Sequence, residues 1–200
     1  MGRLILMISW ITVLHIAKAQ DGNYLDEIKA WQQELNEEYL NPDHSPLSKK
    51  ERQAFKGHNF YPIQEKYRVT ARFEATPDSK PFALATSKGT TKTYKRIGNL
   101  HFQLDGEEYM LEAYVEQRRF SLPGQPIYVF LPLVDETTGN ETYGAGRYMH
   151  YEGIPEGTEW VIDFNKLYNP YCAYSNNYEC PKVPEANYLP IKVEAGIKGY

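Results

Sequence analysis

The stretch YRVTARFEA, residues 67–75, decides the fold class. Apolar side chains occupy every second position from Tyr67 to Phe73, and polar or charged side chains lie between them. Because successive side chains of a strand point to opposite faces, this period of two predicts a β-strand with one face on a hydrophobic core. The sequence thus predicts a sheet that is buried on one side.

The same kind of pattern continues on the C-terminal side of this stretch. Asp105-Gly106 is a strong signal for a two-residue hairpin turn, and Gly98-Asn99 predicts another turn. The apolar run at 127–134 is interrupted by Pro132, which favours a buried or edge strand. We predict an antiparallel meander over residues 67–117. The strands are expected at residues 67–75, 82–87, 90–96, 100–104, 109–115, 127–134, 147–151, 160–164 and 190–195.

Two helices are predicted on the N-terminal side of this stretch. Between residues 21 and 40 apolar residues recur every three or four positions, which predicts a helix with one buried face. Asn41-Pro42 ends this helix. Ser48 and Glu51 form a capping-box pattern that starts a second, shorter helix. The expected buried face of the first helix comprises Leu25, Ile28, Trp31, Leu35 and Tyr39.

The first residues, MGRLILMISWITVLHIAKAQ, have the pattern of a secretory signal peptide. Arg3 provides a positive start, residues 4–16 are mostly apolar, and Ala17-Lys18-Ala19 fits a cleavage site. An uncleaved anchor is the alternative, but the apolar run is short for a bilayer. We therefore expect an exported protein, periplasmic or secreted, that does not span the membrane after cleavage.

The charge of the chain excludes some partners. The formal net charge is −4, and removing residues 1–19 leaves 20 Lys and Arg against 26 Asp and Glu, a net charge of −6. An acidic chain argues against nucleic acid, whose phosphates require a basic surface.

The domain organisation follows from these patterns. We predict a signal peptide at 1–19, an N-terminal helical arm at 20–57 and a β domain at 58–200. The fold class is mainly β, a single antiparallel β-barrel or sandwich-like domain with a short N-terminal helical arm and a long C-terminal loop. That loop, residues 165–189, shows no period, and long loops in compact domains are often functional.

Several motifs resemble one known family. They are TYGAGRY at 142–148, DFNKLYNPYCAY at 163–174 and CPKVPEANYLPIKVEAGIK at 180–198, with SPLSKKERQAF at 45–55 and NFYPIQEKYRV at 59–69 upstream. Together they resemble the bacterial family catalogued as domain of unknown function 1684, in its Bacteroidetes-type members. This chain has GAGR and AGIK where GGGR and AGEK are commoner in the family, which argues against a catalytic role at position 197. The resemblance implies a shared fold and no particular activity.

The same motifs suggest a site. We expect TYGAGRY and DFNKLYNPYCAY to form two walls of a small pocket in which Arg147 holds an anion and Asp163 orients Arg147. Tyr143 belongs to the first wall, and Glu194 is expected to close the pocket. The alternative is structural: a β-bulge in which Arg147 pairs with a buried acid, and asparagines that only pin the loop. The further residues expected at the pocket are Asn165, Asn169, Tyr171 and Asn187.

Cys172 and Cys180 are the two cysteines of the chain, and export would permit a disulfide between them. Two thiolates cannot form a four-cysteine zinc site, and we predict no metal site and no cofactor. Two weaker alternatives are a Cys172–His150 nucleophile pair and a metal site formed by the two thiolates and His150.

The leading functional prediction is binding of a small polar or anionic ligand. One alternative is a hydrolase that uses Asp163 or Glu194 as a general base. Another is a structural module that contacts a protein through its tyrosine-rich surface. The sequence contains no nucleophile elbow, phosphate loop, HExxH or dinucleotide fingerprint, so it leaves open whether the protein is an enzyme.

Overall fold

The computed structural model describes residues 9–120 and 126–199. Its elements are α1 (Ser9–Leu40), α2 (Lys49–Ala54), β1 (Arg68–Ala75), β2 (Phe82–Ala85), β3 (Thr91–Leu104), β4 (Glu107–Glu116), α3 (Gln117–Phe120), β5 (Tyr128–Asp135), β6 (Arg147–Glu152), β7 (Glu159–Asp163) and β8 (Tyr188–Leu189). Short 3-10 turns lie at Glu65–Tyr67, Phe164–Lys166, Tyr171–Ala173 and Glu185–Asn187.

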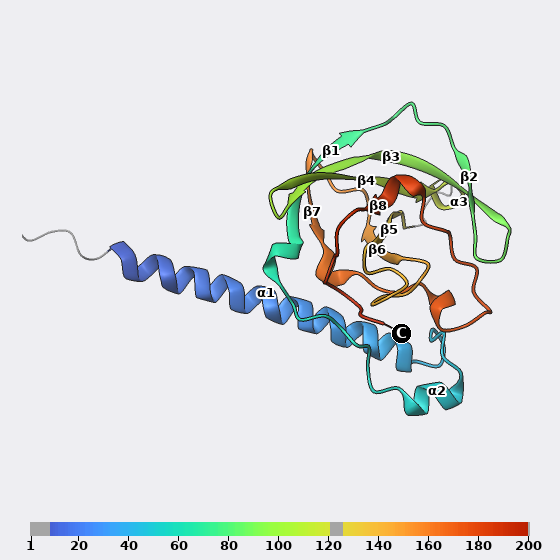
Figure 1. The fold of residues 1–200 in the computed structure, drawn as a ribbon, viewed down its shortest axis with the longest axis horizontal. Helices are drawn as coiled ribbons and strands as arrows, with labels where there is room; N and C mark the ends of the chain where they lie inside the picture. Colours follow the sequence, from blue (N-terminus) through green and yellow to red (C-terminus); the bar gives the residue numbers. More distant parts are fainter. Residues whose placement is uncertain (1–8, 121–125, 200) are drawn as a thin grey trace, which may run out of the picture.

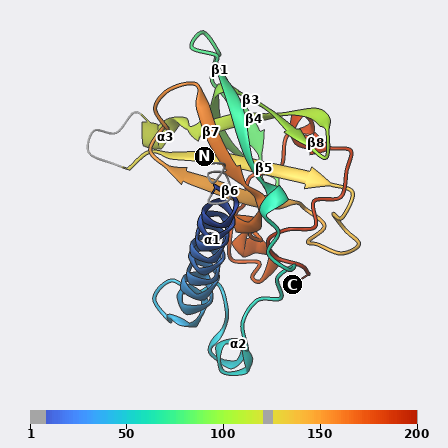
Figure 2. The ribbon, with the colours of Figure 1, turned by 90° about the vertical axis from the view of Figure 1, so that its left-hand side faces the viewer.

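The strands form one sheet in the order β6-β5-β4-β3-β1-β7, with β2 added to β3 and β8 added to β5. All pairings along this path are antiparallel, and the short β5–β8 pairing is parallel. The sheet curls into a half-barrel, with the C-terminal half of α1 lying across its open side (Figures 1 and 2). The predicted mainly β, antiparallel fold with an N-terminal helical arm is confirmed.

The core fills the inside of the half-barrel. Each strand contributes every second side chain to it, as the alternation in YRVTARFEA predicted, and Leu100, Leu111 and Leu131 are fully buried. A second apolar cluster lies around Phe130 and Tyr148, so β5 is covered on both faces. This double burial explains why residues 127–134 read as a nearly continuous apolar run.

The strands β6 and β7 are the two ends of the sheet, and they approach each other across the open side. The Tyr151 hydroxyl donates to the Val161 carbonyl over 2.9 Å. Helix α1 lies over this seam (Figure 2). The seam, the helix and the C-terminal loop therefore define the region where a cavity can form.

Helix α1 ends at Leu40, as the Asn41-Pro42 signal predicted. Ile28, Leu35 and Tyr39 are buried, but Leu25 is 38% exposed and Tyr24 is buried instead. Residues 1–8 of the predicted signal peptide lie outside the described residues, and residues 9–19 form the first part of α1. Among the described residues, no helix combines the length and apolar composition that a membrane crossing requires.

Two turn signals gave different outcomes. Asp105 and Gly106 adopt φ values of 52° and 88° at the β3–β4 hairpin, so that prediction is confirmed. The turn expected at Gly98-Asn99 is wrong, because β3 runs through both residues with a register shift between Arg96 and Gly98. A Cβ at Gly98 would lie 2.2 Å from the Phe73 ring, so this glycine allows close packing.

Two other local predictions can be compared with the structure. The capping box at Ser48 and Glu51 is confirmed at the start of α2. The strand expected at 190–195 is wrong: β8 covers only Tyr188–Leu189, and residues 190–195 form no ladder, although Val193 and Ala195 are buried in the core. What holds that segment is a buried arginine, described below.

Candidate functional site

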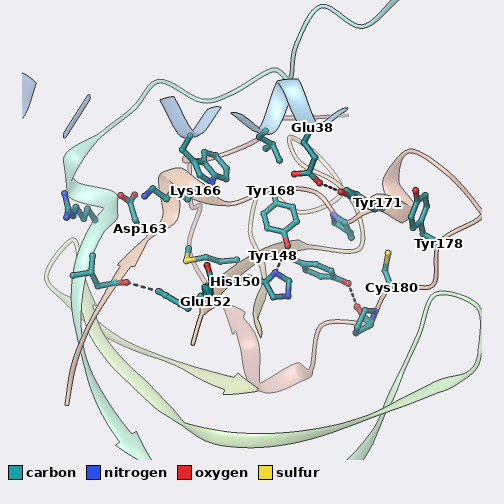
Figure 3. Close-up of a pocket in the computed structure, with 18 of the residues that line it drawn as sticks. Glu38, Tyr148, His150, Glu152, Asp163, Lys166, Tyr168, Tyr171, Tyr178 and Cys180 are labelled. Atoms are coloured by element: carbon teal, nitrogen blue, oxygen red, sulfur yellow. Dashed lines mark hydrogen bonds between the residues drawn. The ribbon is translucent and has the colours of Figure 1, made fainter. Parts of the chain in front are cut away.

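The candidate site is a cavity of about 900 Å³ under α1, at the seam of the half-barrel (Figure 3). Helix α1 forms one side, β6 and β7 form another, and the loop after β7 forms the third. A volume of this size suits a small organic ligand. The lining residues are Glu27, Trp31, Leu35, Glu38, Arg68, Lys92, Tyr148, Met149, His150, Tyr151, Glu152, Val161, Asp163, Lys166, Tyr168, Pro170, Tyr171, Tyr178, Glu179, Cys180 and Pro181.

Aromatic side chains from β6 and the C-terminal loop occupy the middle of the cavity. The Tyr168 hydroxyl and His150 Nδ1 are hydrogen-bonded, and the His150 ring stacks on Phe130 with 5.1 Å between ring centroids. The Tyr148 hydroxyl donates to the Pro181 carbonyl. Burial raises the pKa of both tyrosines well above the usual value, so both hydroxyls keep their protons. The result is an aromatic wall with fixed hydrogen-bonding groups, in which both tyrosines are uncharged.

One end of the cavity carries paired charges. Lys166 Nζ lies 2.7 Å from a Glu27 carboxylate oxygen, and Arg68 lies 4.0 Å from the other oxygen of the same group. The hydrogen bond from Lys166 holds the pKa of Glu27 below its usual value. The Arg68 guanidinium also lies over the Tyr24 ring, 4.9 Å from its centroid. These contacts join α1 to β1 and to the loop after β7.

Asp163 lies beside this end and is 7% exposed. The Tyr24 hydroxyl contacts both carboxylate oxygens, at 3.0 and 3.1 Å. Asn165 donates to the same carboxylate through its backbone N–H at 3.1 Å and its side-chain amide at 3.0 Å. Burial, and then the Asp163 charge, raise the pKa of Tyr24. Asp163 is therefore a hydrogen-bonded anchor for α1 at the cavity wall.

The opposite end carries hydroxyls and carboxylates. The Tyr171 hydroxyl donates to Glu38, which comes from the last turn of α1. Tyr178 packs against Tyr171 edge to face at 4.9 Å. Lys92 Nζ donates to the Glu179 backbone carbonyl over 2.9 Å. Figure 3 shows Asp163 and Lys166 toward one end, Tyr171, Tyr178 and Cys180 toward the other, and His150 between them.

Arg147 is not part of this cavity, and its expected pairing with Asp163 is wrong. Its side chain is fully buried, with Nη2 3.1 Å from the Asp135 carboxylate. It also donates to three backbone carbonyls of the C-terminal segment: Val193 at 2.8 Å, Ala195, and Ile197 at 3.3 Å. Burial lowers the pKa of the guanidinium, and the Asp135 carboxylate offsets part of that effect. Arg147 thus braces the C-terminal segment against the sheet.

Gly146 of TYGAGRY serves the same brace. Gly146 has φ of +90°, and a Cβ there would lie 2.6 Å from the Leu133 carbonyl. Only glycine fits this bend into β6. Because neighbouring strand residues point to opposite faces, Tyr148 points to the cavity while Arg147 points into the core. The motif therefore contributes to the pocket through its last residue only.

The other predicted pocket residues divide into two groups. Tyr171 and Asp163 line the cavity. Asn165 does not line it, but its side chain donates to Asp163, which does. Asn169 and Asn187 are fully buried and pin the chain. Asn169 donates to the Gly199 carbonyl at 2.9 Å.

Asn187 bridges β4 and β5 where the two strands separate. It accepts from Glu112 N–H at 2.8 Å and donates to the Pro132 carbonyl at 2.7 Å. Glu194 is exposed, and neither it nor Tyr143 is among the residues that line the cavity. The loop-pinning alternative therefore describes Asn169 and Asn187 better than ligand contact does.

The two cysteines are free thiols that lie side by side, with the Cys172 backbone N–H 3.2 Å from Cys180 Sγ. Cys180 lines the cavity. In the described part of the chain, no group of three or more His, Cys, Asp and Glu side chains could hold a metal ion.

Sequence reasoning missed several cavity residues. Trp31 was predicted only as part of a buried helical face, and Glu38, Lys166 and Tyr168 were given no role. The helical period did place Trp31, Leu35 and Glu38 on neighbouring positions of one helix. Which surface that helix covers depends on the sheet, so the sequence pattern could not assign these residues to a site.

The protein is a mainly β module. Its antiparallel sheet is curled, an N-terminal helix covers the seam of the sheet, and a cavity lined by aromatic and charged side chains lies under that helix. The chain belongs to the family described as protein of unknown function DUF1684, whose profile matches residues 53–198. This match confirms the family resemblance drawn from the motifs, while the Bacteroidetes-type detail stays a prediction.

The structure is similar to the solution NMR structure of an uncharacterised protein from Haloarcula marismortui. The two chains share 31% sequence identity with a TM-score of 0.67, over 90% of this chain and 96% of that chain. No curated protein matches the chain.

Proposed function

We propose that the protein binds a small polar molecule in the cavity under α1. The observation that carries this proposal is a cavity of about 900 Å³ whose walls join both sequence motifs to the helix. Such a cavity, with an aromatic wall and a few fixed polar groups, has the features of a small-molecule site. Aromatic rings stack on planar or apolar parts of a ligand, and the flanking charges and hydroxyls hold its polar groups.

The charges of the lining favour a neutral or cationic ligand over an anion. Arg147, the expected anion-holding group, is bonded to Asp135 and to the chain and lies in the core. Of the remaining cations, Lys166 is paired with Glu27. Cations are also attracted to aromatic faces. The lining contains the carboxylates Glu27, Glu38, Glu152, Asp163 and Glu179 against the cations Arg68, Lys92 and Lys166.

Export belongs to the same proposal. Cleavage after Ala19 would leave Tyr24 as the fifth residue of the mature chain, so the helical wall of the cavity would be retained. N-terminal sequencing of protein recovered from the native host checks this. A chain that begins at Met1 in the cytoplasmic fraction would contradict it.

The two alternatives stay predictions. A general base at Asp163 would have to act while Tyr24 and Asn165 donate to that carboxylate. Glu194 is exposed and does not line the cavity, so it has no bound substrate to act on there. A protein partner would use the outer surface and leave the cavity unchanged.

A thermal-shift screen with a matched pair of variants tests the proposal. The panel contains neutral and cationic polar metabolites, with anionic ones as the comparison. A ligand at about 100 times its Kd stabilises the folded state by about 2.7 kcal/mol, which raises the Tm of a domain of this size by roughly 5–10 °C.

His150→Ala removes a ring from the middle of the cavity, and His101→Ala removes a histidine from the outer face of the sheet, where it contacts Glu74. We expect His101→Ala to keep the ligand-induced shift and His150→Ala to lose most of it. Equal shifts in both variants, or no shift with any compound, would overturn the proposal.

A further inference from the structure

Cys172 and Cys180 form a pair whose position is fixed by contacts outside the pair. Cys172 lies in the 3-10 turn Tyr171–Ala173, and its backbone N–H points at Cys180 Sγ. Cys180 is held by Ser87, which lies two residues after the end of β2. The Ser87 N–H donates to the Cys180 carbonyl at 2.8 Å, and the Cys180 N–H donates to Ser87 Oγ at 3.2 Å. The two cysteine side chains therefore lie next to each other in the folded chain.

The two thiols have different surroundings. Cys172 is half-buried and so can be reached from solvent, whereas Cys180 is buried. Hydrogen bonds from the thiol of Cys180 and from the hydroxyls of Tyr143 and Ser87 lower the pKa of Cys172. The hydrogen bond to Cys172, together with burial, raises the pKa of Cys180. One member of the pair is thus the better nucleophile, and the other keeps its proton.

We propose that this pair is an oxidation site, at which a hydroperoxide oxidises Cys172 and Cys180 then closes a disulfide. In the first step the Cys172 thiolate forms an S–O bond with the outer peroxide oxygen as the O–O bond breaks. The leaving hydroxide or alkoxide takes a proton from water. This gives a sulfenic acid on Cys172.

In the second step the sulfur of Cys180 bonds to the sulfur of Cys172 as the S–O bond breaks. The departing hydroxide takes the proton of the Cys180 thiol and leaves as water. Overall, two thiols lose two electrons and two protons and become a disulfide. Hydrogen peroxide is reduced to two waters, and an organic hydroperoxide is reduced to one alcohol and one water. No other reactant is required.

The location gives the oxidation a structural consequence. The residues Tyr178 to Pro181 form part of the cavity wall, and the disulfide would tie this wall to the turn that carries Tyr171. A metal function for the pair is not supported within the described residues, since no third His, Cys, Asp or Glu joins the two thiols there. The oxidation site does not depend on the ligand-binding proposal.

Thiol trapping on the full-length reduced protein tests the inference. After treatment with hydrogen peroxide under native conditions, we expect the intact mass to fall by two hydrogens and both cysteines to resist alkylation until reductant is added. In Cys180→Ser, a sulfenic-acid probe should label Cys172. In Cys172→Ser, labelling of Cys180 should be slower by roughly tenfold or more.

Wild type sampled at short times gives the same information if a cysteine variant does not fold. Two thiols that stay alkylatable after peroxide treatment, or labelling at Cys180 in preference to Cys172, would overturn the inference.

A hydroxyl variant provides the matched control. Tyr143→Phe removes one donor to Cys172, so we expect the pH midpoint of Cys172 alkylation to rise and peroxide oxidation at neutral pH to slow. Ser175→Ala removes a hydroxyl of the loop that carries Cys172, where it accepts from Asn177 N–H. This variant should leave the pH midpoint and the oxidation rate unchanged. Identical pH midpoints in wild type and Tyr143→Phe would contradict the assigned surroundings of Cys172.

Discussion

The brace around Arg147 and the cavity under α1 both contain charged groups, but they differ in how those groups are satisfied. Arg147 and Asp135 are completely buried, and their partners are fixed backbone and side-chain groups of the chain itself. In the cavity, Lys166 and Glu27 are partly exposed, and aromatic rings separate the charges. The first arrangement holds the chain together, and the second leaves polar groups within reach of a ligand.

This comparison shows that the most conspicuous motif need not be the site. TYGAGRY contains two glycines and an arginine, a pattern that suits anion binding, yet in this fold it shapes a bend and anchors the C-terminal segment. The cavity instead uses residues that look ordinary in the sequence, such as Trp31 and Tyr168.

The largest effect is expected from Arg147→Met. It leaves the buried Asp135 carboxylate without its cationic partner and three backbone carbonyls without the guanidinium donor, so the free energy of unfolding should fall by about 3–5 kcal/mol. Arg68→Met is the matched control, because Arg68 lies at the cavity edge with 40% of its side chain exposed, and it should lose less than about 1 kcal/mol. Urea denaturation measures both values, and equal losses would remove the distinction.

Local patterns predicted the strands well because the alternation of YRVTARFEA and the Asp105-Gly106 hairpin depend on near neighbours. The partner of Arg147 depends on the order of the strands. Asp135 and Asp163 each end an apolar strand, so the sequence does not distinguish them. In the sheet, β6 pairs with β5, whose last residue is Asp135. Asp163 is on β7, which pairs with β1 at the other end of the sheet.

The same limit applies to the cavity. The sequence correctly brought Asp163, Tyr171 and the loop after β7 to one region, since they are close along the chain. It did not place α1 over them, because the Tyr24–Asp163 contact joins residues 139 positions apart. Gly98 shows the limit at one residue: a glycine that permits contact with Phe73 looks the same in the sequence as a glycine in a turn.

The next largest effect is a pH dependence at His58, a half-buried histidine that does not line the cavity under α1. His58 lies in a box of aromatic rings, 4.3 Å from Tyr39 and 5.0 Å from Phe55, and burial lowers its pKa to about 4. The unfolded chain has a histidine pKa near 6.5 and binds the proton more readily. Stability is therefore full above about pH 6.5 and falls as the pH drops toward 4, by about 3 kcal/mol in total.

His58→Phe should remove this part of the pH dependence, while His101→Gln, on the outer face of the sheet, should keep it. The measurement is the urea midpoint from neutral pH down to about pH 4, compared between the variants, since carboxylates titrate in all of them. Parallel curves for wild type and His58→Phe would show that His58 is not held neutral by the fold.

A smaller loss is expected where α1 meets the cavity wall. Tyr24→Phe removes the hydroxyl that donates to Asp163 at 3.0 Å, and hydrogen bonds to charged groups contribute about 1.5–3 kcal/mol. Tyr39→Phe removes another buried tyrosine hydroxyl of α1, which makes a 3.5 Å contact with the Asn169 carbonyl, and should cost less than about 1 kcal/mol. Urea denaturation, with amide exchange along α1, measures both, and a larger loss in Tyr39→Phe would contradict the role of Asp163 as an anchor.

The smallest effect is expected from Lys166→Gln, which removes the charge that faces Glu27 at the open end of the cavity. Partly exposed ion pairs contribute little, so stability should change by less than about 1 kcal/mol. The hydrogen bond from Lys166 lowers the pKa of Glu27, so the variant should raise that pKa toward its usual value.

A carboxyl with a lowered pKa stabilises the fold above its unfolded pKa and loses that contribution as the pH falls through its folded pKa, so the small difference between wild type and Lys166→Gln should vanish in acid. An NMR titration of the Glu27 carboxyl measures the shift, and Lys29→Gln, which faces Asp26 on the exposed side of α1, is the control. If Lys166→Gln instead destabilised the protein as much as Arg147→Met, the charged groups of the cavity would stabilise the fold as the Arg147 brace does. The proposal that they are available to a ligand would then be wrong.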